Sequence, residues 1–329
     1  MAKIFITGLN GQDSSYLAEY MLELGHEVHG IVRRHSDALN QQSRLEPIRD
    51  RIYAHYGDMT DATSIEHVLE EVKPDYIFNI AAQSHVAVSF NVPVYTCDTN
   101  ALGTLRLLEA YRRICPKARF YQASSSEMFG LSIDPDGYQR ETTLMNPTSP
   151  YGVAKVFAYN MTRHFRRAYS LHACNGILFN HESKRRGVNF VSQKVVKTAV
   201  EISLGLTDKL ELGAIDSKRD WGHSYDYVRA MWQIVNHDKP DDWVVATGET
   251  RSVREMCDYV FGYLGMDYRN YVTQNPRFMR SEELPYLRGD STRIRTILGW
   301  SPKYTFETMM VEMIEHWQDF HKNHTGWRQ

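Results

Sequence analysis

KIFITGLNGQDSSYLAEYMLEL, residues 3–24, opens with an apolar strand pattern, continues through a glycine-bearing turn and ends in a helical pattern. Residues 4–6 are expected to form a buried strand, and the apolar residues from 13 to 24 recur on one helical face. Gly8 and Gly11 stand at the turn between them. At such a turn a pyrophosphate can approach the helix N-terminus, where free N–H groups and the helix dipole favour negative charge. The stretch predicts a dinucleotide-binding turn; an ordinary glycine-containing turn is the alternative.

The same alternation of short apolar runs and longer helical patterns continues through the first half of the chain. Gly25 is expected to end the first helix, and further helical patterns lie at about 61–72 and 99–113. Further strands are expected at residues 28–32, 52–56, 76–79, 120–123 and 173–179. Strand–helix alternation of this kind gives a parallel sheet covered on both faces. The expected fold is therefore α/β, a Rossmann-type doubly wound parallel sheet.

After about residue 179 the alternation gives way to charged loops and to helices mixed with turn signals. At 329 residues the chain is also longer than a usual single domain. We expect residues 1–179 to form a dinucleotide-binding Rossmann domain that carries the catalytic residues. Residues 180–329 are expected to form mainly a smaller C-terminal α/β lobe that binds substrate, with some chain returning to the first domain.

The composition excludes several classes of protein. Hydrophobic residues make up 42 % of the chain, enough for a globular core, and a net charge of −2 argues against nucleic acid or an anionic membrane as partner. No apolar stretch is long enough to span a membrane, and the first residues enter a strand at once, unlike a signal peptide. The four cysteines form no C-x-x-C pair and the 14 histidines no metal motif. A cytoplasmic protein without a metal site is the expectation.

The end of the second expected strand bears on which dinucleotide binds. An NAD enzyme usually carries Asp or Glu there for the ribose 2′-hydroxyl. This chain instead has Arg33, Arg34, His35 and Ser36. NADP is therefore favoured, because Arg forms charge-assisted, often bidentate hydrogen bonds with a 2′-phosphate; a solvated basic loop is the alternative. Asp58 follows the third strand, where such folds commonly contact the adenine.

Tyr151 and Lys155 form a Y-x-x-x-K pair at the start of a helical pattern. Residues four apart share a helix face, so the ammonium can lie near the phenol and lower the pKa of Tyr151 toward that of a general base. About one such pair is expected by chance among 20 tyrosines. Ser125 strengthens the prediction, because it follows the fifth expected strand at the edge where Rossmann-like folds place their chemistry. Its hydroxyl could hydrogen-bond the atom that Tyr151 deprotonates.

Glu127 adds an acid/base group that a simple dehydrogenase or epimerase does not need. A carboxylate that takes a carbon-bound proton and then protonates a departing hydroxyl is what an elimination requires. The alternative is that Glu127 caps a turn while the neighbouring serines fill a loop.

Longer motifs make the chain similar to a known family. They are TGLNGQD at 7–13, VHGIVRR at 28–34, AQSHV at 82–86, FYQAS at 120–124, GILFNHES at 176–183, KRDWG at 218–222 and ATGE at 246–249. FNHES and KRDWG are far more specific than the glycine turn. By these motifs the chain resembles the GDP-mannose 4,6-dehydratase family, within the extended short-chain dehydrogenase/reductase superfamily, over almost its whole length.

The resemblance implies a lyase that converts GDP-D-mannose to GDP-4-keto-6-deoxy-D-mannose and water, with NADP as cofactor and no net redox change. Tyr151 would take the proton of the sugar O4′ while the C4′ hydride passes to the cofactor. Ser125, where the family usually has Thr, would hydrogen-bond O4′. Glu127 would remove the C5′ proton and help the C6′ hydroxyl leave as water, after which the hydride returns to C6′.

The resemblance also implies binding residues and an assembly. Cofactor contacts would be Gly8, Asn10, Gly11, Gln12, Asp13, Arg33, Arg34, His35, Ser36, Asp58, Met59, Ile80, Ala81, Ala82, Gln83, Ser84, Tyr95, Lys155, His181 and Arg186. Contacts to the GDP-sugar would be Ser84, Asn180, Lys194, Arg219, Arg280 and Glu283. In this family the loop of residues 33–36 reaches a neighbouring subunit's cofactor, which implies a homotetramer, or a dimer.

The chain departs from the family pattern at several points. Ser14 replaces the third glycine of the turn, Lys184 stands where Pro is usual, and the loop between Glu127 and Tyr151 is about two residues longer than usual. The family's R-P-x-E-V-D reads RSEELP at residues 280–285. That last change bears on substrate identity. Dehydration of a related GDP-sugar such as a GDP-manno-heptose is therefore one alternative, an epimerase or reductase of the same fold a second, and a catalytically silent NADP-binding protein a third.

Overall fold

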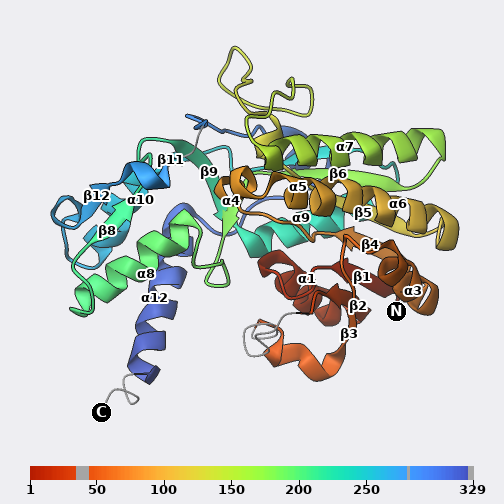
Figure 1. Ribbon diagram of the computed structural model, residues 1–329, viewed down its shortest axis with the longest axis horizontal. Helices are drawn as coiled ribbons and strands as arrows, with labels where there is room; N and C mark the ends of the chain where they lie inside the picture. The colour runs from red at the N-terminus through yellow and green to blue at the C-terminus, as the bar shows by residue number, and fades with distance from the viewer. Residues whose placement is uncertain (35–43, 280–281, 325–329) are drawn as a thin grey trace.

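The computed structural model describes residues 1–34, 44–279 and 282–324 (Figure 1). Its centre is a sheet of seven strands, all paired in parallel. In spatial order the strands are β10 (Asp242–Val245), β6 (Ala173–Leu178), β5 (Arg119–Ser125), β4 (Tyr76–Asn79), β1 (Lys3–Thr7), β2 (Glu27–Val32) and β3 (Ile52–Tyr56). The chain starts in the middle of the sheet and winds outward in both directions, so the Rossmann-type doubly wound fold expected from the sequence is confirmed.

Six of the seven strands lie within two residues of the positions predicted from the sequence. The seventh, β10, comes from the second half of the chain and was not predicted. It pairs with β6 in the register Asp242↔Asn175 to Val245↔Leu178. It follows a charged stretch, residues 238–241, in the half of the chain where the strand–helix alternation is lost, whereas β4, of the same length, lies within that alternation.

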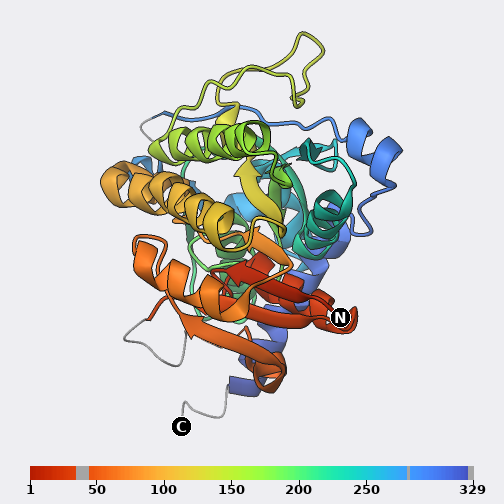
Figure 2. The same cartoon turned by 90° about the vertical axis from the view of Figure 1, so that its right-hand side faces the viewer.

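Helices cover both faces of the sheet, as Figure 2 shows from a second side. One face is covered by α1 (Gln12–Glu23) and α9 (Ser224–Asn236), whose apolar residues form one core with β1, β2 and β10. The other face is covered by α3 (Ala62–Val72), α6 (Gly103–Ile114) and α7 (Pro150–Ala168). Between β4 and α6 lie α4 (Val86–Asn91), α5 (Pro93–Cys97) and a π-helical turn, η2 (Asp98–Leu102), so the helix predicted at 99–113 begins with a wider turn.

The second half of the chain builds a smaller body with its own core. Its strands form a three-stranded sheet, β11 (Thr250–Ser252), β9 (Lys218–His223) and β7 (Asn180–Glu182), and a pair, β12 (Val272–Gln274) and β8 (Leu210–Leu212). Around them pack α8 (Val191–Ser203), α10 (Val253–Tyr263) and α12 (Phe306–His324). A capping box fixes the start of α10, because Ser252 Oγ accepts from Glu255 N (3.1 Å) and Glu255 Oε2 accepts from Ser252 N (2.6 Å).

The remaining elements are short and lie within or between these bodies. They are α11 (Thr292–Leu298) and the 3₁₀ turns η1 (Glu46–Arg51), η3 (Ser126–Met128), η4 (Tyr268–Asn270) and η5 (Pro276–Phe278). In the part of the chain that the structure describes, none of the helices combines the length and apolarity needed to cross a bilayer.

Candidate active site

The glycine turn between β1 and α1 has the geometry of a phosphate-binding turn. Gly8 has φ +66°, and a Cβ at this position would lie 3.0 Å from Cα of Ala81, so a side chain would be both strained and crowded. Gly11 is the N-cap of α1, and its N–H donates to Gly8 O (2.8 Å). The first N–H groups of α1 have no partner within the helix and point toward the turn. This cradle fits the pyrophosphate of a dinucleotide.

Ser14 is accommodated at the third glycine position of the turn. Its side chain is fully buried, and its Oγ lies 3.4 Å from Thr7 O, to which it donates a hydrogen bond. A small hydroxyl therefore packs between α1 and β1.

Asp13 and His181 form a buried ion pair beside this turn. His181 Nε2 lies 2.8 Å from Asp13 Oδ2, and His181 Nδ1 lies 2.7 Å from Phe179 O. A carbonyl oxygen and a carboxylate only accept hydrogen bonds, so both ring nitrogens donate and His181 is an imidazolium. Burial alone would favour the neutral ring, but the Asp13 charge and hydrogen bond raise the pKa of His181 above its ordinary value. The pair joins α1 to the segment that begins the smaller body.

Gln12 reinforces the same junction with its side-chain amide. Its Nε2 donates to Asp13 Oδ1 (3.1 Å) and to His181 O (3.2 Å), while its Oε1 accepts from Ser183 Oγ (3.0 Å). The side chain of Gln12 is thus committed to protein partners. Its predicted contact with a cofactor would have to come from its backbone N–H at the helix N-terminus.

Other predicted cofactor residues lie along the carboxyl ends of neighbouring strands. Thr7 Oγ1 accepts from Ile80 N (3.0 Å) and Ala81 N (2.9 Å), which fixes the chain after β4 against the glycine turn. Arg33, at the end of β2, donates to the hydroxyl of Tyr95 on α5. Two predicted residues of the basic loop, His35 and Ser36, lie outside the described residues.

The predicted catalytic residues come together at the ends of β5 and α7. Ser149 caps α7 by accepting from Gly152 N (3.0 Å), and Pro150 occupies the first helical position, so Tyr151 lies in the first turn. Ser125 ends β5, and its Oγ accepts from Glu127 N (3.2 Å). The side chains of Ser125, Glu127 and Tyr151 are all at least nine-tenths buried.

Burial dominates the ionisation of the tyrosine–lysine pair. It raises the pKa of Tyr151 to about 12, although a hydrogen bond with Ser125 acts in the opposite direction. Lys155 Nζ donates to Ala123 O (2.8 Å) and lies 5.7 Å from the centroid of the Tyr151 ring. Burial also lowers the pKa of Lys155 to about 8. The sequence predicts that Lys155 lowers the pKa of Tyr151, whereas in this structure burial is the largest influence and raises that pKa.

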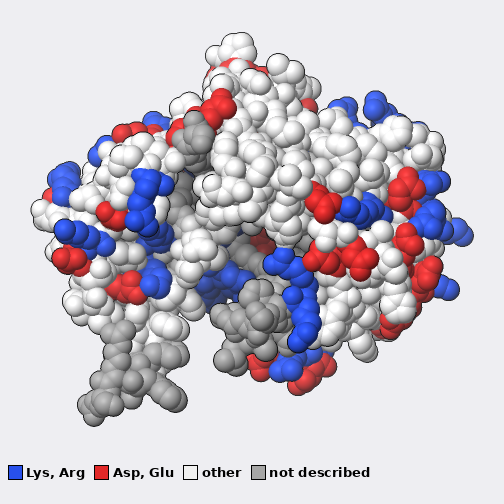
Figure 3. Space-filling view, in the orientation of Figure 1, with Lys and Arg blue, Asp and Glu red and all other residues white. Residues whose placement is uncertain are grey.

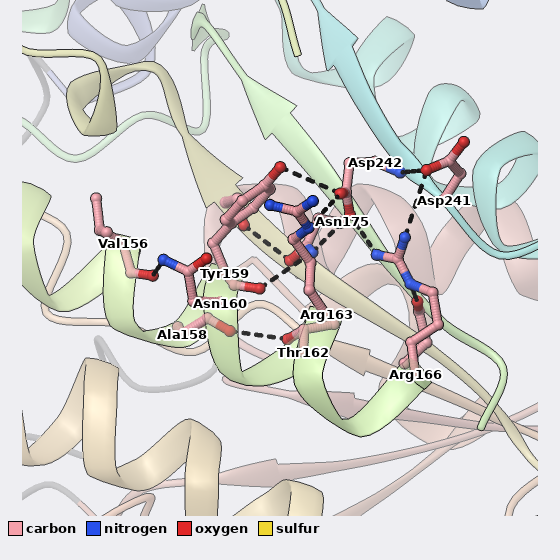
Figure 4. A network of polar contacts seen from close by, with 12 residues as sticks. Val156, Ala158, Tyr159, Asn160, Thr162, Arg163, Arg166, Asn175, Asp241 and Asp242 are labelled. Carbon is pink, nitrogen blue, oxygen red and sulfur yellow. Dashed lines mark hydrogen bonds and ion pairs between the residues drawn. The ribbon is translucent and has the colours of Figure 1, made fainter. Parts of the chain in front are cut away.

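A polar network fixes the helix that carries this pair (Figure 4). Tyr159, two turns after Tyr151, donates from its hydroxyl to Asp242 Oδ2 on β10 (3.1 Å). Asp242 Oδ1 pairs with Arg166 on the same helix and accepts from Asn175 Nδ2 on β6 (2.8 Å). Asn175 Oδ1 accepts in turn from Ser124 Oγ (3.1 Å), next to the end of β5. The network therefore links α7 to the strand that ends in Ser125.

A cavity of about 850 Å³ brings many of the predicted residues together between the sheet edge and the smaller body. That volume suits a ligand of drug size or somewhat larger. Lys and Arg side chains gather in the hollowed middle of this face (Figure 3). The predicted residues that line the cavity are Asp13, Ile80, Ala82, Ser84, Ser125, Glu127, Tyr151, Lys155, Asn180, His181, Arg186, Lys194, Arg219 and Glu283.

The other described residues on the predicted list lie outside this cavity, beside the carboxyl ends of β1 to β4 or, for Tyr95, on α5. They are Gly8, Asn10, Gly11, Gln12, Arg33, Arg34, Asp58, Met59, Ala81, Gln83 and Tyr95. Asp58 uses Oδ1 to accept from Thr60 N (2.9 Å), and Met59 is buried in the core. Arg280, predicted to contact the sugar nucleotide, lies outside the described residues.

Cationic side chains line the end of the cavity that the smaller body forms. Arg219, on β9, is buried and donates to Leu284 O (2.8 Å). Lys194, in the first turn of α8, donates to Glu211 O (2.5 Å), and its ammonium lies 3.7 Å from the centroid of the Phe278 ring. Arg186 adds a third positive charge nearer the catalytic residues. Such a set fits a diphosphate.

Several lining residues were missed by the sequence prediction. His85, Phe190, Arg277 and Phe278 line the cavity but were not predicted as site residues. Three of them lie within three residues of predicted positions, since His85 follows Ser84, and Arg277 and Phe278 come shortly before Arg280. Phe190 has no such signal, because an aromatic residue before a helix is more often part of a core.

Comparisons with known proteins agree over nearly the whole chain. The family model described as GDP-mannose 4,6 dehydratase matches residues 5–313. GDP-mannose 4,6 dehydratase 1 of Arabidopsis thaliana is 47 % identical over 322 residues, which cover 94 % of this chain and 88 % of that protein. The GDP-mannose 4,6-dehydratase of Yersinia enterocolitica is 45 % identical over 350 residues (95 % and 93 %), and the human one is 43 % identical over 337 residues (94 % and 89 %).

Solved structures share the fold at much lower identity. A dTDP-glucose 4,6-dehydratase from Bacillus anthracis in complex with NAD superposes with a TM-score of 0.84 at 22 % identity, covering 99 % of this chain and 98 % of that one. RMD from Pseudomonas aeruginosa complexed with NADPH gives a TM-score of 0.80 at 22 % identity, covering 97 % and 100 %. These two likenesses concern the fold alone.

Proposed function

The chain belongs to the GDP-mannose 4,6-dehydratase family, and from that premise we propose that it converts GDP-D-mannose to GDP-4-keto-6-deoxy-D-mannose and water as an NADP-dependent lyase. The observation that carries this proposal is the convergence of Ser125, Glu127, Tyr151 and Lys155 on one cavity whose other end is lined by cations. A hydroxyl, a carboxylate and a phenol are the groups that oxidation at C4′ and elimination across C5′ and C6′ require.

Each of these side chains has a separate task in the proposed reaction. Tyr151 accepts the proton of the sugar O4′, and Ser125 orients that oxygen by a hydrogen bond. Glu127 removes the C5′ proton, which the adjacent ketone makes acidic, and delivers it to the departing C6′ hydroxyl. When the hydride enters C6′, C5′ regains a proton from Tyr151, which holds the one taken from O4′. A bound nicotinamide would supply a place to hold the hydride between its loss from C4′ and its return to C6′. In its oxidised form the nicotinamide ring carries a positive charge.

The residues that would hold the cofactor are those of the glycine turn and of the strand ends beside it. The helix N-terminus at Gly11 would bind the pyrophosphate, and Asp58 would contact the adenosine. Lys155 would bind the nicotinamide ribose beside Tyr151. Arg33 and Arg34 are exposed at the end of β2, where a 2′-phosphate would lie. This placement supports NADP rather than NAD.

The proposed reaction is tested by incubating the purified protein with GDP-mannose and no added reductant, followed by mass spectrometry. We expect a product lighter by one water that becomes a 6-deoxyhexose nucleotide after borohydride reduction. An unchanged mass would refute GDP-mannose as substrate. GDP-manno-heptose is then the next compound to assay, because the RSEELP segment at 280–285 departs from the family pattern.

Arg33→Asp is expected to shift the cofactor preference from NADP toward NAD. The substitution replaces a guanidinium that would bind the 2′-phosphate with a carboxylate that repels it, so the ratio of KM for NADP to KM for NAD should rise by about tenfold or more. Arg49→Asp is the matched control, because it makes the same charge change at an exposed residue paired only weakly with Glu46 (3.9 Å). An unchanged ratio in Arg33→Asp would contradict recognition of the 2′-phosphate by this residue.

We also propose that the enzyme is a cytoplasmic homotetramer, or a dimer, assembled through the loop of residues 33–36. The loop is where family members contact a neighbouring subunit. A reducing compartment is supported by the cysteines, since Cys97, Cys115, Cys174 and Cys257 are all free.

A further inference from the structure

The cavity has two walls that come from distant parts of the chain. One wall is α4 with its N-cap residue His85, and the other is the segment 188–191 that enters α8. α4 packs against α7, which carries the catalytic pair, whereas α8 belongs to the core of the smaller body. A contact between the two walls therefore joins the catalytic side of the cavity to the side that carries Lys194 and Arg219.

Such a contact is made by the ring of Phe190. The ring centroid lies 3.6 Å from Cζ of Arg186 and 5.1 Å from the centroid of the His85 ring, with 40° between the ring planes. His85 also bonds to the same segment through Nε2, which lies 3.2 Å from Asn189 O. Because His85 Nδ1 accepts from Val88 N (3.3 Å), the ring proton is on Nε2, and Nε2 donates. We call His85, Phe190 and Arg186 the aromatic bridge.

Arg186 is held in place by an acidic side chain of the smaller body. Its Nε forms an ion pair with Glu182 Oε2 (3.0 Å), and that carboxylate also accepts from Ser192 Oγ (2.6 Å). These protein contacts hold the guanidinium over Phe190. Its charge also reaches the catalytic residues, since it partly offsets the rise that burial causes in the pKa of Tyr151. The bridge is therefore rigid on one side and close to the chemistry.

We infer that Phe190 is a further positioning residue of the reaction, and that the aromatic bridge closes the cavity over the sugar so that the ketone intermediate stays bound until water is lost. The inference rests on the proposed function. Oxidation at C4′ gives a neutral ketone that still carries its C6′ hydroxyl. If this ketone escapes, its proton stays on the enzyme and its hydride on the bound cofactor, and the turnover is aborted. A closed wall also excludes water from the charged groups.

Phe190→Ala is expected to open this wall. We predict that kcat/KM for GDP-mannose falls by about 10²-fold, the size of loss that misplacement of a bound substrate causes. We also predict that mass spectrometry detects a released sugar nucleotide two hydrogens lighter than GDP-mannose, at up to one equivalent per bound cofactor, which the wild type does not release. Phe190→Tyr keeps the ring and is expected to restore both values. Phe320→Ala is the control, because it removes a partly exposed ring of α12 outside the cavity.

A double-mutant cycle separates the bridge from a general effect on folding. His85→Ala removes the other wall of the bridge, so its effect on kcat/KM and that of Phe190→Ala should be strongly non-additive. Additive effects, or wild-type turnover without escape of the ketone in Phe190→Ala, would overturn the inference.

Binding measurements keep this test independent of the proposed function. Calorimetric titration with GDP-mannose is expected to give a Kd about tenfold weaker for Phe190→Ala than for the wild type. If the wild type failed to turn over GDP-mannose but this difference in Kd persisted, the proposed function would fall, and with it the retention of the ketone, while the role of the bridge in binding the sugar nucleotide would stand. If the wild type turned the substrate over and both Kd and kcat/KM were unchanged in Phe190→Ala, the bridge would fall and the proposed function would stand.

Discussion

Glu127→Gln is expected to bind the cofactor and GDP-mannose as the wild type does and to lose dehydration by about 10²- to 10⁴-fold. The carboxylate is buried at the start of η3, with its backbone N–H fixed by Ser125 Oγ (3.2 Å), so the amide of similar size should occupy the same place. It cannot take the C5′ proton or return one to the C6′ hydroxyl. The loss should therefore appear in kcat rather than in Kd.

Solvent isotope exchange makes the test of Glu127 specific. In deuterated water the wild-type product should carry deuterium at C5′, which loses and regains a proton, and none at C6′, which receives the hydride from C4′. Glu127→Gln should block the entry of deuterium at C5′. Glu141→Gln is the matched control, since this carboxylate accepts from Val244 N (2.8 Å) and does not line the cavity. Turnover close to the wild-type rate in Glu127→Gln would remove Glu127 from the proton transfers.

The fold was predictable from the sequence because a doubly wound sheet repeats a local pattern. Each buried strand is an apolar run of recognisable length, and each is followed by a helical pattern, so six strands lie within two residues of their predicted positions. β10 was not predicted, because its four residues follow a charged stretch and show no hydrophobic periodicity. Its place beside β6 depends on pairing between residues more than sixty positions apart in the chain. The π-helical turn η2 was also not predicted, because hydrophobic spacing does not distinguish it from the α-helix that follows.

The site was predictable where a residue's place follows from the strand that precedes it. Parallel strands end at the same edge of the sheet, so Ser125 after β5 and Asp58 after β3 had to lie near the glycine turn. Properties that depend on tertiary packing were not accessible in this way. The pKa of Tyr151 is set by burial and not by helical spacing from Lys155, and Phe190 reaches His85 only because the smaller body folds back over α4.

Tyr151→Phe is the second substitution with a large expected effect, a fall in kcat of about 10²- to 10⁴-fold. The phenylalanine keeps the buried ring in the first turn of α7 and removes only the phenolic oxygen that, in the proposed reaction, accepts the O4′ proton as phenolate. The pH dependence of the activity provides a second test of this role of Tyr151. Burial raises the pKa of Tyr151 to about 12, so the phenolate is scarce near neutral pH and becomes more abundant as the pH rises. Wild-type kcat/KM, which reports the ionisations of the free enzyme, should therefore increase with pH below that value, and the residual activity of Tyr151→Phe should not.

Tyr159→Phe is the control for this experiment, because the same chemical change falls on the same helix two turns later. Its hydroxyl bonds to Asp242 Oδ2 (3.1 Å) and anchors α7 to β10. Loss of that bond should cost about 1 kcal/mol of stability, measurable by denaturant unfolding, while kcat/KM keeps its rise with pH. If Tyr151→Phe lost no more activity than Tyr159→Phe, or kept the wild-type pH profile, the O4′ proton would have to pass to another group. The two substitutions therefore test anchoring of the helix and transfer of the O4′ proton separately, at two tyrosines of α7.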